Sequence, residues 1–355
     1  MYYENSKKMY SIMEKPLNIF GLSGINADKR QFFRLPPYML EKMPQYEFLG
    51  KRSIGGRVRF VTNSGTLLVR MTLDACREDR SVPLSCSSGA DIYLGRGKES
   101  VYVGYVSSTI HTMEEITVEG IFKKKPELEI VTINLPRNDL VLGMEIGIDE
   151  NAVILEAPNY RISEPVVYYG SSITEGGCTG RVGNTYASIV SRWLDADFYN
   201  YGFSGSAKGE PEFAAYIASL PKISLLVYDY DYNAPDAEHL QNTHENFFKI
   251  IRRARPELPI VIMSRPNPDI NPFETAVRKE IIIKTWQNAI NSGDERVWFL
   301  DGGDFFGVEG RMECTVDGTH PNALGFMRMA EKIYPLLEQI LGGTVNEYRE
   351  TFSDT

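Results

Sequence analysis

The chain has 355 residues, of which 43% are hydrophobic and 24% are charged, as is usual for a water-soluble globular protein. Two domains are expected, because this length exceeds what one ordinary hydrophobic core organises. The formal net charge of −9 argues against nucleic acid and membrane partners, since phosphates and anionic lipids both attract basic surfaces.

The amino-terminal residues show no sign of export. They contain lysines but no apolar segment of the kind that a signal peptide carries. No apolar run approaches the roughly 20 residues that a membrane helix needs. The four cysteines are widely spaced and form no CxxC motif: Cys76, Cys86, Cys178 and Cys314. Together these features predict a reduced, cytoplasmic protein.

Residues 1–160 are predicted to form an all-β sandwich or jelly-roll domain. Gly56–Thr62 alternates polar and apolar side chains, and Thr66–Met71 is expected to be the strand that returns beside it. Further strands are predicted at Ser100–Val106, Glu115–Ile121, Glu127–Ile133, Leu140–Ile148 and Val153–Leu155. Short strands at this spacing, without a helical period between them, are typical of antiparallel sandwiches.

The pattern changes in residues 161–345, and a linker is predicted at 157–165, across the start of this part. Short apolar runs indicate strands at Val166–Gly170, Phe198–Gly202, Ile223–Tyr230, Pro259–Ser264 and Val297–Asp301. Helices are predicted at Thr185–Asp195 (with Asn184 as its N-cap), Glu238–Ala254, Phe273–Asn291 and Asn322–Leu341. Strands that alternate with helices predict an α/β fold, a flavodoxin-like doubly wound parallel sheet. Residues 346–355 are expected to form a loose polar tail.

Four short motifs follow the predicted strands or precede the last helix: Gly170-Ser171-Ser172, Asn200–Gly205, Asn233, and Asp317-Gly-Thr-His320. A serine becomes a nucleophile when a neutral imidazole accepts its proton and a carboxylate holds that imidazole. Among the four histidines, only His320 has a carboxylate, Asp317, three residues before it in a Gly-containing turn. Each motif alone is commonly an ordinary turn. Their order indicates a serine hydrolase, because these loops converge at one sheet edge.

Taken together, these motifs resemble those of the SGNH (GDSL-type) hydrolases over about residues 165–341. Gly170–Thr174 is similar to the nucleophile block of that family, with Ser171 where the family usually has Asp. The resemblance implies a catalytic triad of Ser172, His320 and Asp317. It also implies three oxyanion donors: the N–H groups of Ser172 and Gly205 and the amide of Asn233. Asn233 follows Asp-Tyr here, rather than Gly-x as in the family.

Gly89–Tyr93 resembles the Gly-x-Asp-Leu-Tyr motif of a β-sandwich domain that precedes some SGNH esterases. Asp91 and Tyr93 are expected to brace a turn, and the alternative is that their loop leans over the catalytic crevice. The resemblance implies hydrolysis of short-chain acyl esters, foremost O-acetyl groups on carbohydrate, without a metal or cofactor. Acyl transfer to a small-molecule alcohol uses the same residues and stays open, as does assembly into a homo-oligomer.

Two other catalytic interpretations remain. A metal hydrolase could use carboxylates that suit Mg²⁺ or Ca²⁺, although no HxH or HExxH motif accompanies them; these are Asp229, Asp231, Asp301 and Asp304. Asp229 and Asp231 are expected on one face of a strand. Cys178 could be a nucleophile, although a single buried cysteine more often only packs.

A non-catalytic protein is the third alternative. Such a protein would bind carbohydrate through aromatic side chains of the sandwich, the candidates being Tyr102, Tyr105 and Phe122. Aromatic residues in strands are more often part of the core. The presence of Ser172, Asp317 and His320 favours an enzyme.

Overall fold

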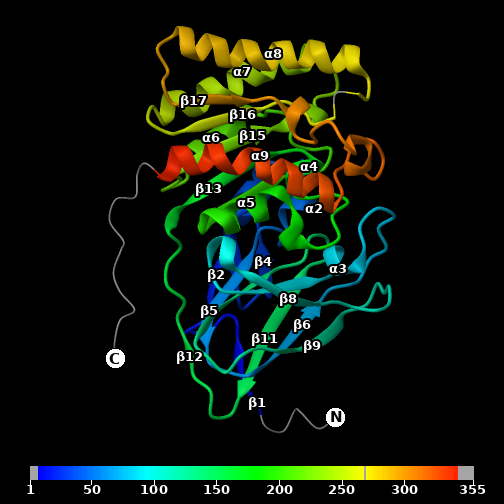
Figure 1. The fold of residues 1–355 in the computed structure, drawn as a ribbon, viewed down its shortest axis with the longest axis vertical. Helices are drawn as coiled ribbons and strands as arrows, with labels where there is room; N and C mark the ends of the chain where they lie inside the picture. Colours follow the sequence, from blue (N-terminus) through cyan, green and yellow to red (C-terminus); the bar gives the residue numbers. More distant parts are fainter. Residues whose placement is uncertain (1–6, 268, 343–355) are drawn as a thin grey trace.

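The computed structural model describes residues 7–267 and 269–342, so the predicted tail at 346–355 lies outside the described residues. Two parts are stacked along the long axis of the molecule (Figure 1). The amino-terminal part consists of antiparallel sheets, and the carboxyl-terminal part is a parallel sheet between helices. The predicted fold class, an α/β sheet preceded by an all-β part, is confirmed.

The sandwich is built from two main antiparallel sheets. One has the strand order β1-β11-β6-β9, and the other has the order β12-β5-β10-β7-β8 with β2 paired to β5. The bounds are β1 Lys7–Ser11, β2 Asn18–Phe20, β5 Arg57–Thr62, β6 Thr66–Leu73, β7 Ala90–Leu94, β8 Val101–Val106, β9 Ile116–Lys123, β10 Glu129–Asn134, β11 Val141–Asp149 and β12 Ile154–Leu155. Their inward apolar side chains form one core between the sheets.

The predicted hairpin between Gly56–Thr62 and Thr66–Met71 is wrong. β5 pairs with β2, β10 and β12, whereas β6 pairs with β9 and β11. The chain crosses from one sheet to the other at Ser64, which is buried and donates to Asp149 Oδ2 at 2.9 Å. The two-residue period predicts that both segments are strands, but it carries no information about which strands they pair with.

Several short elements inside residues 1–160 were not predicted. They are β3 Gly24–Asn26, β4 Gln31–Phe33, α1 Pro37–Lys42, η2 Pro44–Tyr46, α2 Glu47–Gly50, α3 Leu84–Ser87 and η3 Gly97–Glu99. Leu35, Met39 and Tyr46 are buried in the core of the α/β part rather than in the sandwich core. This helical insertion therefore joins the two parts of the molecule.

The α/β part contains a parallel sheet in the order β14-β13-β15-β16-β17. The bounds are β13 Ile162–Gly170, β14 Ala196–Gly202, β15 Leu225–Asp229, β16 Ile260–Met263 and β17 Val297–Leu300. In chain order this is 2-1-3-4-5, the flavodoxin-like arrangement, whose ligands bind at the carboxyl ends of the strands. β13 begins inside the predicted linker at 157–165, because Ile162 already pairs with Ala196.

Helices cover both faces of this sheet, as Figure 1 shows. α5 Tyr186–Leu194 and α9 Ala323–Gly342 pack on one face, and α6 Pro211–Ser219, α7 Ala237–Ala254 and α8 Pro272–Asn291 pack on the other. The N-cap of α5 is Thr185, not the predicted Asn184: Thr185 Oγ1 accepts from Ser188 N at 3.1 Å. Shorter elements are α4 Ser172–Glu175, η4 Val182–Asn184, η5 Tyr230–Asn233, η6 Gly302–Asp304 and η7 Arg311–Cys314.

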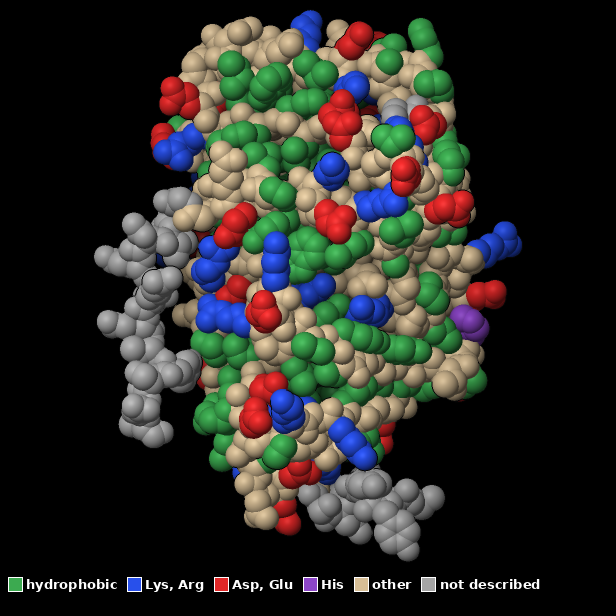
Figure 2. Space-filling view, in the orientation of Figure 1, with side chains coloured by type: hydrophobic (Ala, Val, Ile, Leu, Met, Phe, Trp, Pro, Cys, Tyr) green, Lys and Arg blue, Asp and Glu red, His purple; other side chains and the backbone are tan. Residues whose placement is uncertain are grey.

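The surface carries charges of both signs, and the cysteines form no disulfide. On the face drawn in Figure 2, acidic and basic side chains are interspersed rather than gathered into one patch. Within residues 7–267 and 269–342, no helix is long and apolar enough to cross a membrane. All four cysteines are buried and carry free thiols.

Candidate active site

The turn after β13 places two serines in different environments. Gly170 ends the strand, and a Cβ at this position would overlap Asp229 Oδ1 and Thr174 Oγ1, so only glycine fits. Ser171 is buried and caps α4, since its Oγ accepts from Ile173 N at 3.2 Å. Ser172 is the first residue of that helix and is half-buried. Ser171 thus caps the helix at a position where Asp would be an equally good cap.

Three side chains form a hydrogen-bonded chain at the carboxyl edge of the sheet. Ser172 Oγ lies 2.7 Å from His320 Nε2, and His320 Nδ1 lies 2.7 Å from Asp317 Oδ2. A carboxylate can only accept, so Nδ1 carries the ring proton and Nε2 is left free to accept from the serine hydroxyl. This geometry is that of a serine nucleophile with its general base.

The loop that carries Asp317 and His320 lies between η7 and α9. Asp317 Oδ1 accepts from the N–H groups of Thr319 and His320, at 3.0 and 2.7 Å. Partial burial alone would raise the pKa of Asp317, but these donors and the His320 ring hold that pKa below its usual value. The side chains of His320 and Asp317 are 28% and 49% exposed. The imidazole edge of the site is therefore open to solvent.

Two of the three residues expected to stabilise an oxyanion, Gly205 and Asn233, contact each other. Gly205, in the loop after β14, has φ +66° and donates from its N–H to Asn233 Oδ1 at 3.1 Å. Asn233, in η5 after β15, donates from Nδ2 to Phe203 O at 2.8 Å and keeps a second amide hydrogen. The N–H of Ser172 stands at the first position of α4, where the helix supplies no acceptor.

Glu175 is a site residue that the sequence motifs did not indicate. It ends α4, three residues after Ser172, and its side chain is 1% exposed. Oε1 accepts from Arg34 Nη2 at 3.2 Å, and Oε2 accepts from Arg137 Nη2 at 3.2 Å. Burial alone would raise the pKa of Glu175, but Arg137 and Arg34 hold that pKa below its usual value. Both arginines precede residue 160, so the amino-terminal part directly contacts the helix that begins with Ser172.

The same two arginines also hold the neighbouring loop. Arg34 Nη1 donates to the carbonyl oxygens of Asn200 and Gly202, at 3.2 and 2.7 Å, where β14 ends. Arg137 Nη2 lies 3.1 Å from Ser204 Oγ, and Ser204 N donates to Glu175 Oε2 at 3.0 Å. Ser204, the residue before Gly205, is therefore held by the carboxylate of Glu175, the last residue of α4.

Three of the four carboxylates considered for a metal site, those of Asp229, Asp231 and Asp301, bind protein groups. Asp229 accepts hydrogen bonds from Thr174 Oγ1 and Tyr186 OH, and its burial raises its pKa to about 7. Asp231 lies in η5 rather than in the strand, so it does not share a strand face with Asp229 as expected. Ion pairs occupy Asp231 (with Arg265 and Arg278) and Asp301 (with Lys279).

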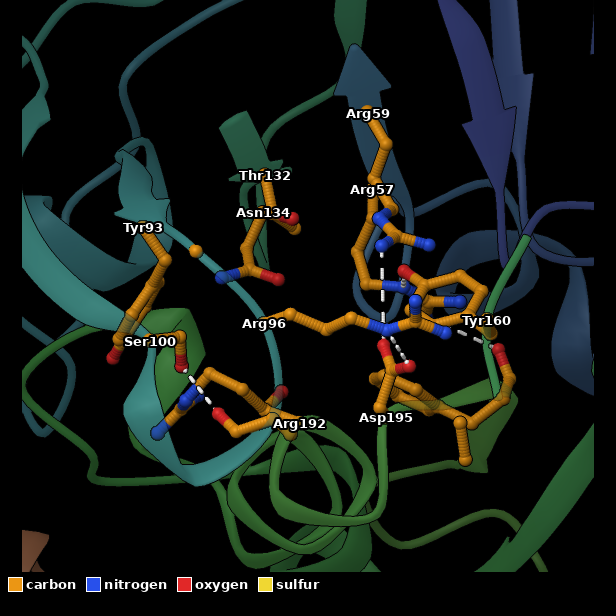
Figure 3. A pocket seen from close by; sticks show the side chains of 15 residues that line it. Arg57, Arg59, Tyr93, Arg96, Ser100, Thr132, Asn134, Tyr160, Arg192 and Asp195 are labelled. Carbon is orange, nitrogen blue, oxygen red and sulfur yellow. Dashed lines mark hydrogen bonds and ion pairs between the residues drawn. The ribbon is translucent and has the colours of Figure 1, made fainter. Parts of the chain in front are cut away.

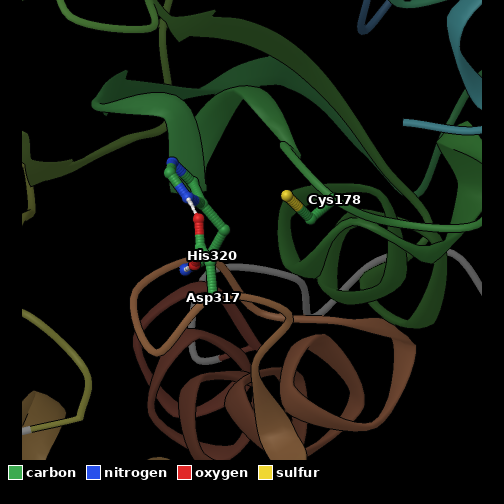
Figure 4. A group of neighbouring side chains, drawn as sticks. All are labelled: Cys178, Asp317 and His320. Atoms are coloured by element: carbon green, nitrogen blue, oxygen red, sulfur yellow. Dashed lines mark hydrogen bonds and ion pairs between the residues drawn. The ribbon is translucent and has the colours of Figure 1, made fainter. Parts of the chain in front are cut away.

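Cys178 lies beside the His320–Asp317 pair, as Figure 4 shows. The three potential ligand atoms lie within 4.8 Å of one another, the one such group among the described residues. Cys178 is buried with φ +68°, and burial raises the pKa of its thiol. A protonated thiol is a weak nucleophile. His320 is hydrogen-bonded to Ser172 and Asp317, so the geometry favours Ser172 over Cys178 as the nucleophile.

Asp91 and Tyr93 brace a turn, η4 of the α/β part, and they lie on a strand rather than on a loop over the crevice. Both are buried on β7, where Asp91 Oδ2 accepts from Gly183 N at 2.9 Å and from Arg181 Nη1 at 3.1 Å. Arg181 Nη1 also donates to Tyr93 OH at 2.5 Å. The motif therefore docks the segment that follows Cys178 onto the sandwich. Tyr102 is partly exposed rather than part of the core, with the Arg181 guanidinium 3.7 Å from its ring centre.

A doubly wound sheet with a serine, histidine and carboxylate at its carboxyl edge defines a serine-hydrolase class of protein. Residues 163–338 match the GDSL-like lipase/acylhydrolase family. Residues 10–154 match the GxDLY domain, the N-terminus of SGNH-hydrolase-type esterases. The chain thus belongs to the GDSL-like lipase/acylhydrolase family, with a GxDLY domain before the catalytic part, and is an ester-hydrolysing enzyme.

Solved structures share the fold over nearly the whole chain. A protein of Bacteroides ovatus described as a GDSL-like lipase is 24% identical, with a TM-score of 0.82, over 95% of this chain and 98% of that one. The salicylyl-acyltransferase of a tetracycline biosynthetic pathway is 21% identical, with a TM-score of 0.75, over 94% and 99%. An acetyl xylan esterase from Butyrivibrio proteoclasticus is 14% identical, with a TM-score of 0.59, over 96% and 100%. A search of curated protein sequences found no match.

Proposed function

We propose that the protein is a serine esterase that removes short acyl groups, foremost O-acetyl groups on carbohydrate, through Ser172, His320 and Asp317. The observation that carries this proposal is the unbroken chain of two 2.7 Å hydrogen bonds from Ser172 Oγ through His320 to Asp317. Such a chain already has the geometry that a serine needs to lose its proton as it attacks.

The reaction follows from this geometry. Ser172 Oγ attacks the ester carbonyl while its proton moves to His320 Nε2, and Asp317 stabilises the imidazolium that results. The new oxyanion accepts from the N–H groups of Ser172 and Gly205 and from the free amide hydrogen of Asn233, and it replaces Asn233 Oδ1 as the partner of Gly205 N. His320 then protonates the leaving alcohol. Water, deprotonated by the same ring, releases the acid from the acyl-enzyme.

The exposure of the site supports a bulky polar alcohol. Because His320 protonates the leaving oxygen, the alcohol must lie on the imidazole side, where His320 and Asp317 are open to solvent. A sugar residue can extend outward there without burying its other hydroxyl groups, which would be costly without partners. The structural likeness to the acetyl xylan esterase agrees with this class of substrate.

A panel of esters tests the proposal. The enzyme would be given p-nitrophenyl esters of increasing acyl length and acetylated sugars, with mass spectrometry of the quenched enzyme. We expect turnover to fall as the acyl chain lengthens, acetate release from the sugars, and an acyl adduct on the peptide that contains Ser172. An adduct elsewhere, or a preference for long acyl chains, would overturn the assignment.

Acyl transfer is a second candidate, and the likeness to the salicylyl-acyltransferase favours it. Transfer needs no additional catalytic residue, because His320 can deprotonate a bound alcohol as well as water. Partitioning distinguishes the two reactions: with added small alcohols or sugars, a transferase yields mainly the new ester. An esterase yields mainly free acid, even when acceptor is abundant.

A further inference from the structure

A second polar cavity lies between the two parts of the molecule, away from Ser172. Its volume is about 40 Å³, and Figure 3 shows the side chains that line it. The sandwich contributes Arg57 and Arg59 from β5 and Arg96 from the loop after β7, and the α/β part contributes Arg192 and Asp195. This cavity is at the start of β14, whereas the Gly205 loop follows the end of that strand.

The charges around this cavity do not balance. Four arginines line it, at positions 57, 59, 96 and 192. The two carboxylates that pair with them are Asp195, which lines the cavity, and Asp197, which binds Arg57. Asp91, a carboxylate whose charge also acts on Arg192, already pairs with Arg181. Two positive charges are therefore in excess around a partly enclosed space, where unpaired charge is costly.

Among the four arginines that line the cavity, Arg59 has the most hydrogen-bond donors without an acceptor. The residue is 1% exposed, and within the described parts of the chain its Nε and Nη1 have no hydrogen-bond partner. Its Nη2 is 3.9 Å from Asp195 Oδ1, beyond hydrogen-bond distance. The Arg59 guanidinium is 3.8 Å from the ring centre of Tyr160. The face of the ring attracts the cation, but it accepts no hydrogen bond from the N–H groups, which lie in the guanidinium plane.

The groups beside Arg59 are engaged mainly by other residues. Asp195 Oδ2 accepts from Arg96 Nε and from Arg161 N, the latter at 2.9 Å. The hydroxyl of Tyr160 accepts from Arg57 Nε at 3.0 Å. An acceptor placed inside the cavity would satisfy the free nitrogens of Arg59.

We propose that this cavity binds a small tetrahedral oxyanion, a phosphate or sulfate group, either free or at the end of a small molecule. Guanidinium groups bind such anions with paired, charge-assisted hydrogen bonds. Arg59 offers the two free nitrogens, and Arg96 and Arg192 supply further positive charge from either side. Because both parts of the molecule line the cavity, a bound anion would strengthen their interface.

Thermal unfolding tests the proposal, with phosphate, sulfate and a sugar phosphate compared against sodium chloride at equal ionic strength. We expect a saturable rise in Tm with at least one oxyanion beyond the effect of chloride, and the loss of this rise in Arg59→Met. The control is Arg296→Met, an exposed arginine that pairs with Glu257, in which the rise should persist. A larger shift with the sugar phosphate than with free phosphate would assign the anion to a small molecule.

An equal shift with chloride, or a shift that survives in Arg59→Met, would overturn the proposal. If Arg59→Met does not fold, crystals of the unaltered protein soaked in selenate decide the question. An anomalous peak within hydrogen-bond distance of Arg59 Nε or Nη1 supports the site, and the absence of one overturns it.

Discussion

Arg137 of the sandwich binds Glu175 of the catalytic part, with Nη2 3.2 Å from Oε2, at the far end of the four-residue helix that begins with Ser172. Arg34 binds the other oxygen of the same carboxylate. The position of Ser172, the proposed nucleophile, therefore depends on residues that the α/β part does not itself contain. The amino-terminal part is thus a structural component of the site.

Replacing the carboxylate tests this arrangement. In Glu175→Gln, two arginines that contact the group keep their charges with no anion between them. Breaking a buried pair from one side costs about 3–5 kcal/mol, so we expect a loss of that order in the free energy of unfolding. Activity should fall too, because Ser204 N also donates to this carboxylate. Urea denaturation and kcat/KM measure the two effects.

The matched control is Glu257→Gln, which breaks the pair with Arg296 at a surface position where the Glu257 side chain is 81% exposed. An exposed pair contributes little, so we expect a change below about 1 kcal/mol and unchanged activity. Equal destabilisation by the two substitutions would show that the pairing of Glu175 with Arg34 and Arg137 contributes no more to stability than an exposed ion pair.

The two adjacent serines should respond differently to the same change. Ser172→Ala removes the proposed nucleophile, and hydrolysis of p-nitrophenyl acetate should fall by about 10⁴-fold or more while the fold survives. Ser171→Ala removes only a helix cap, with a cost of about 1 kcal/mol in stability, and should keep most of the activity. Near-normal turnover by Ser172→Ala would exclude it as the nucleophile.

Asn233→Ala tests the oxyanion assignment. The loss of one donor typically costs about 10²–10³ in kcat, and KM should change little, because the donor acts on the transition state. Asn233 Oδ1 also accepts from Gly205 N, so Asn233→Asp serves as a comparison: it keeps an acceptor and removes the amide donor. An activity near that of the unaltered enzyme in Asn233→Asp would contradict the role of the amide.

Asp229 makes the stability of the protein depend on pH. Its pKa of about 7 in the folded chain exceeds the value of about 3.9 expected when unfolded, so the folded state binds the proton more tightly. Stability from this group is therefore highest below about pH 4, falls as the pH rises to about 7, and is constant above. The effect is at most about 4 kcal/mol.

Asp229→Asn should remove this dependence. We expect the loss of unfolding free energy between pH 5 and pH 8, measured with urea, to be smaller in Asp229→Asn than in the unaltered protein. Asp28→Asn, a change at an exposed residue in the turn between β3 and β4, is the control and should leave the dependence unchanged. The same pH dependence in all three proteins would rule out Asp229 as its source.

The parts of the fold that depend on local patterns could be predicted from the sequence. The strands and most helices of the α/β part follow from hydrophobic period. Two helices were missed: the four-residue α4, and α6, although Pro211 and Glu212 are typical of a helix start. The N-cap of α5 is Thr185 rather than Asn184 because both side chains can cap a helix. The sequence pattern does not indicate which of two adjacent capping residues is used.

Relationships between distant segments could not be predicted. The pairing of β5 and β6 with different sheets depends on the whole sandwich, and a two-residue period looks the same in either sheet. Glu175 lies 141 residues from Arg34 and 38 from Arg137. A charged residue in an apolar stretch indicates that a partner exists, but it does not identify that partner.

The contacts of Arg34 also bear on the order of folding. This residue is synthesised early, yet its acceptors include the carbonyl oxygens of Asn200 and Gly202, 166 and 168 residues later in the chain. Until β14 has joined the sheet, the guanidinium has none of these acceptors, and α4 lacks its anchor. A nascent chain therefore stays inactive through most of its synthesis and gains its catalytic geometry only when both parts have folded and docked.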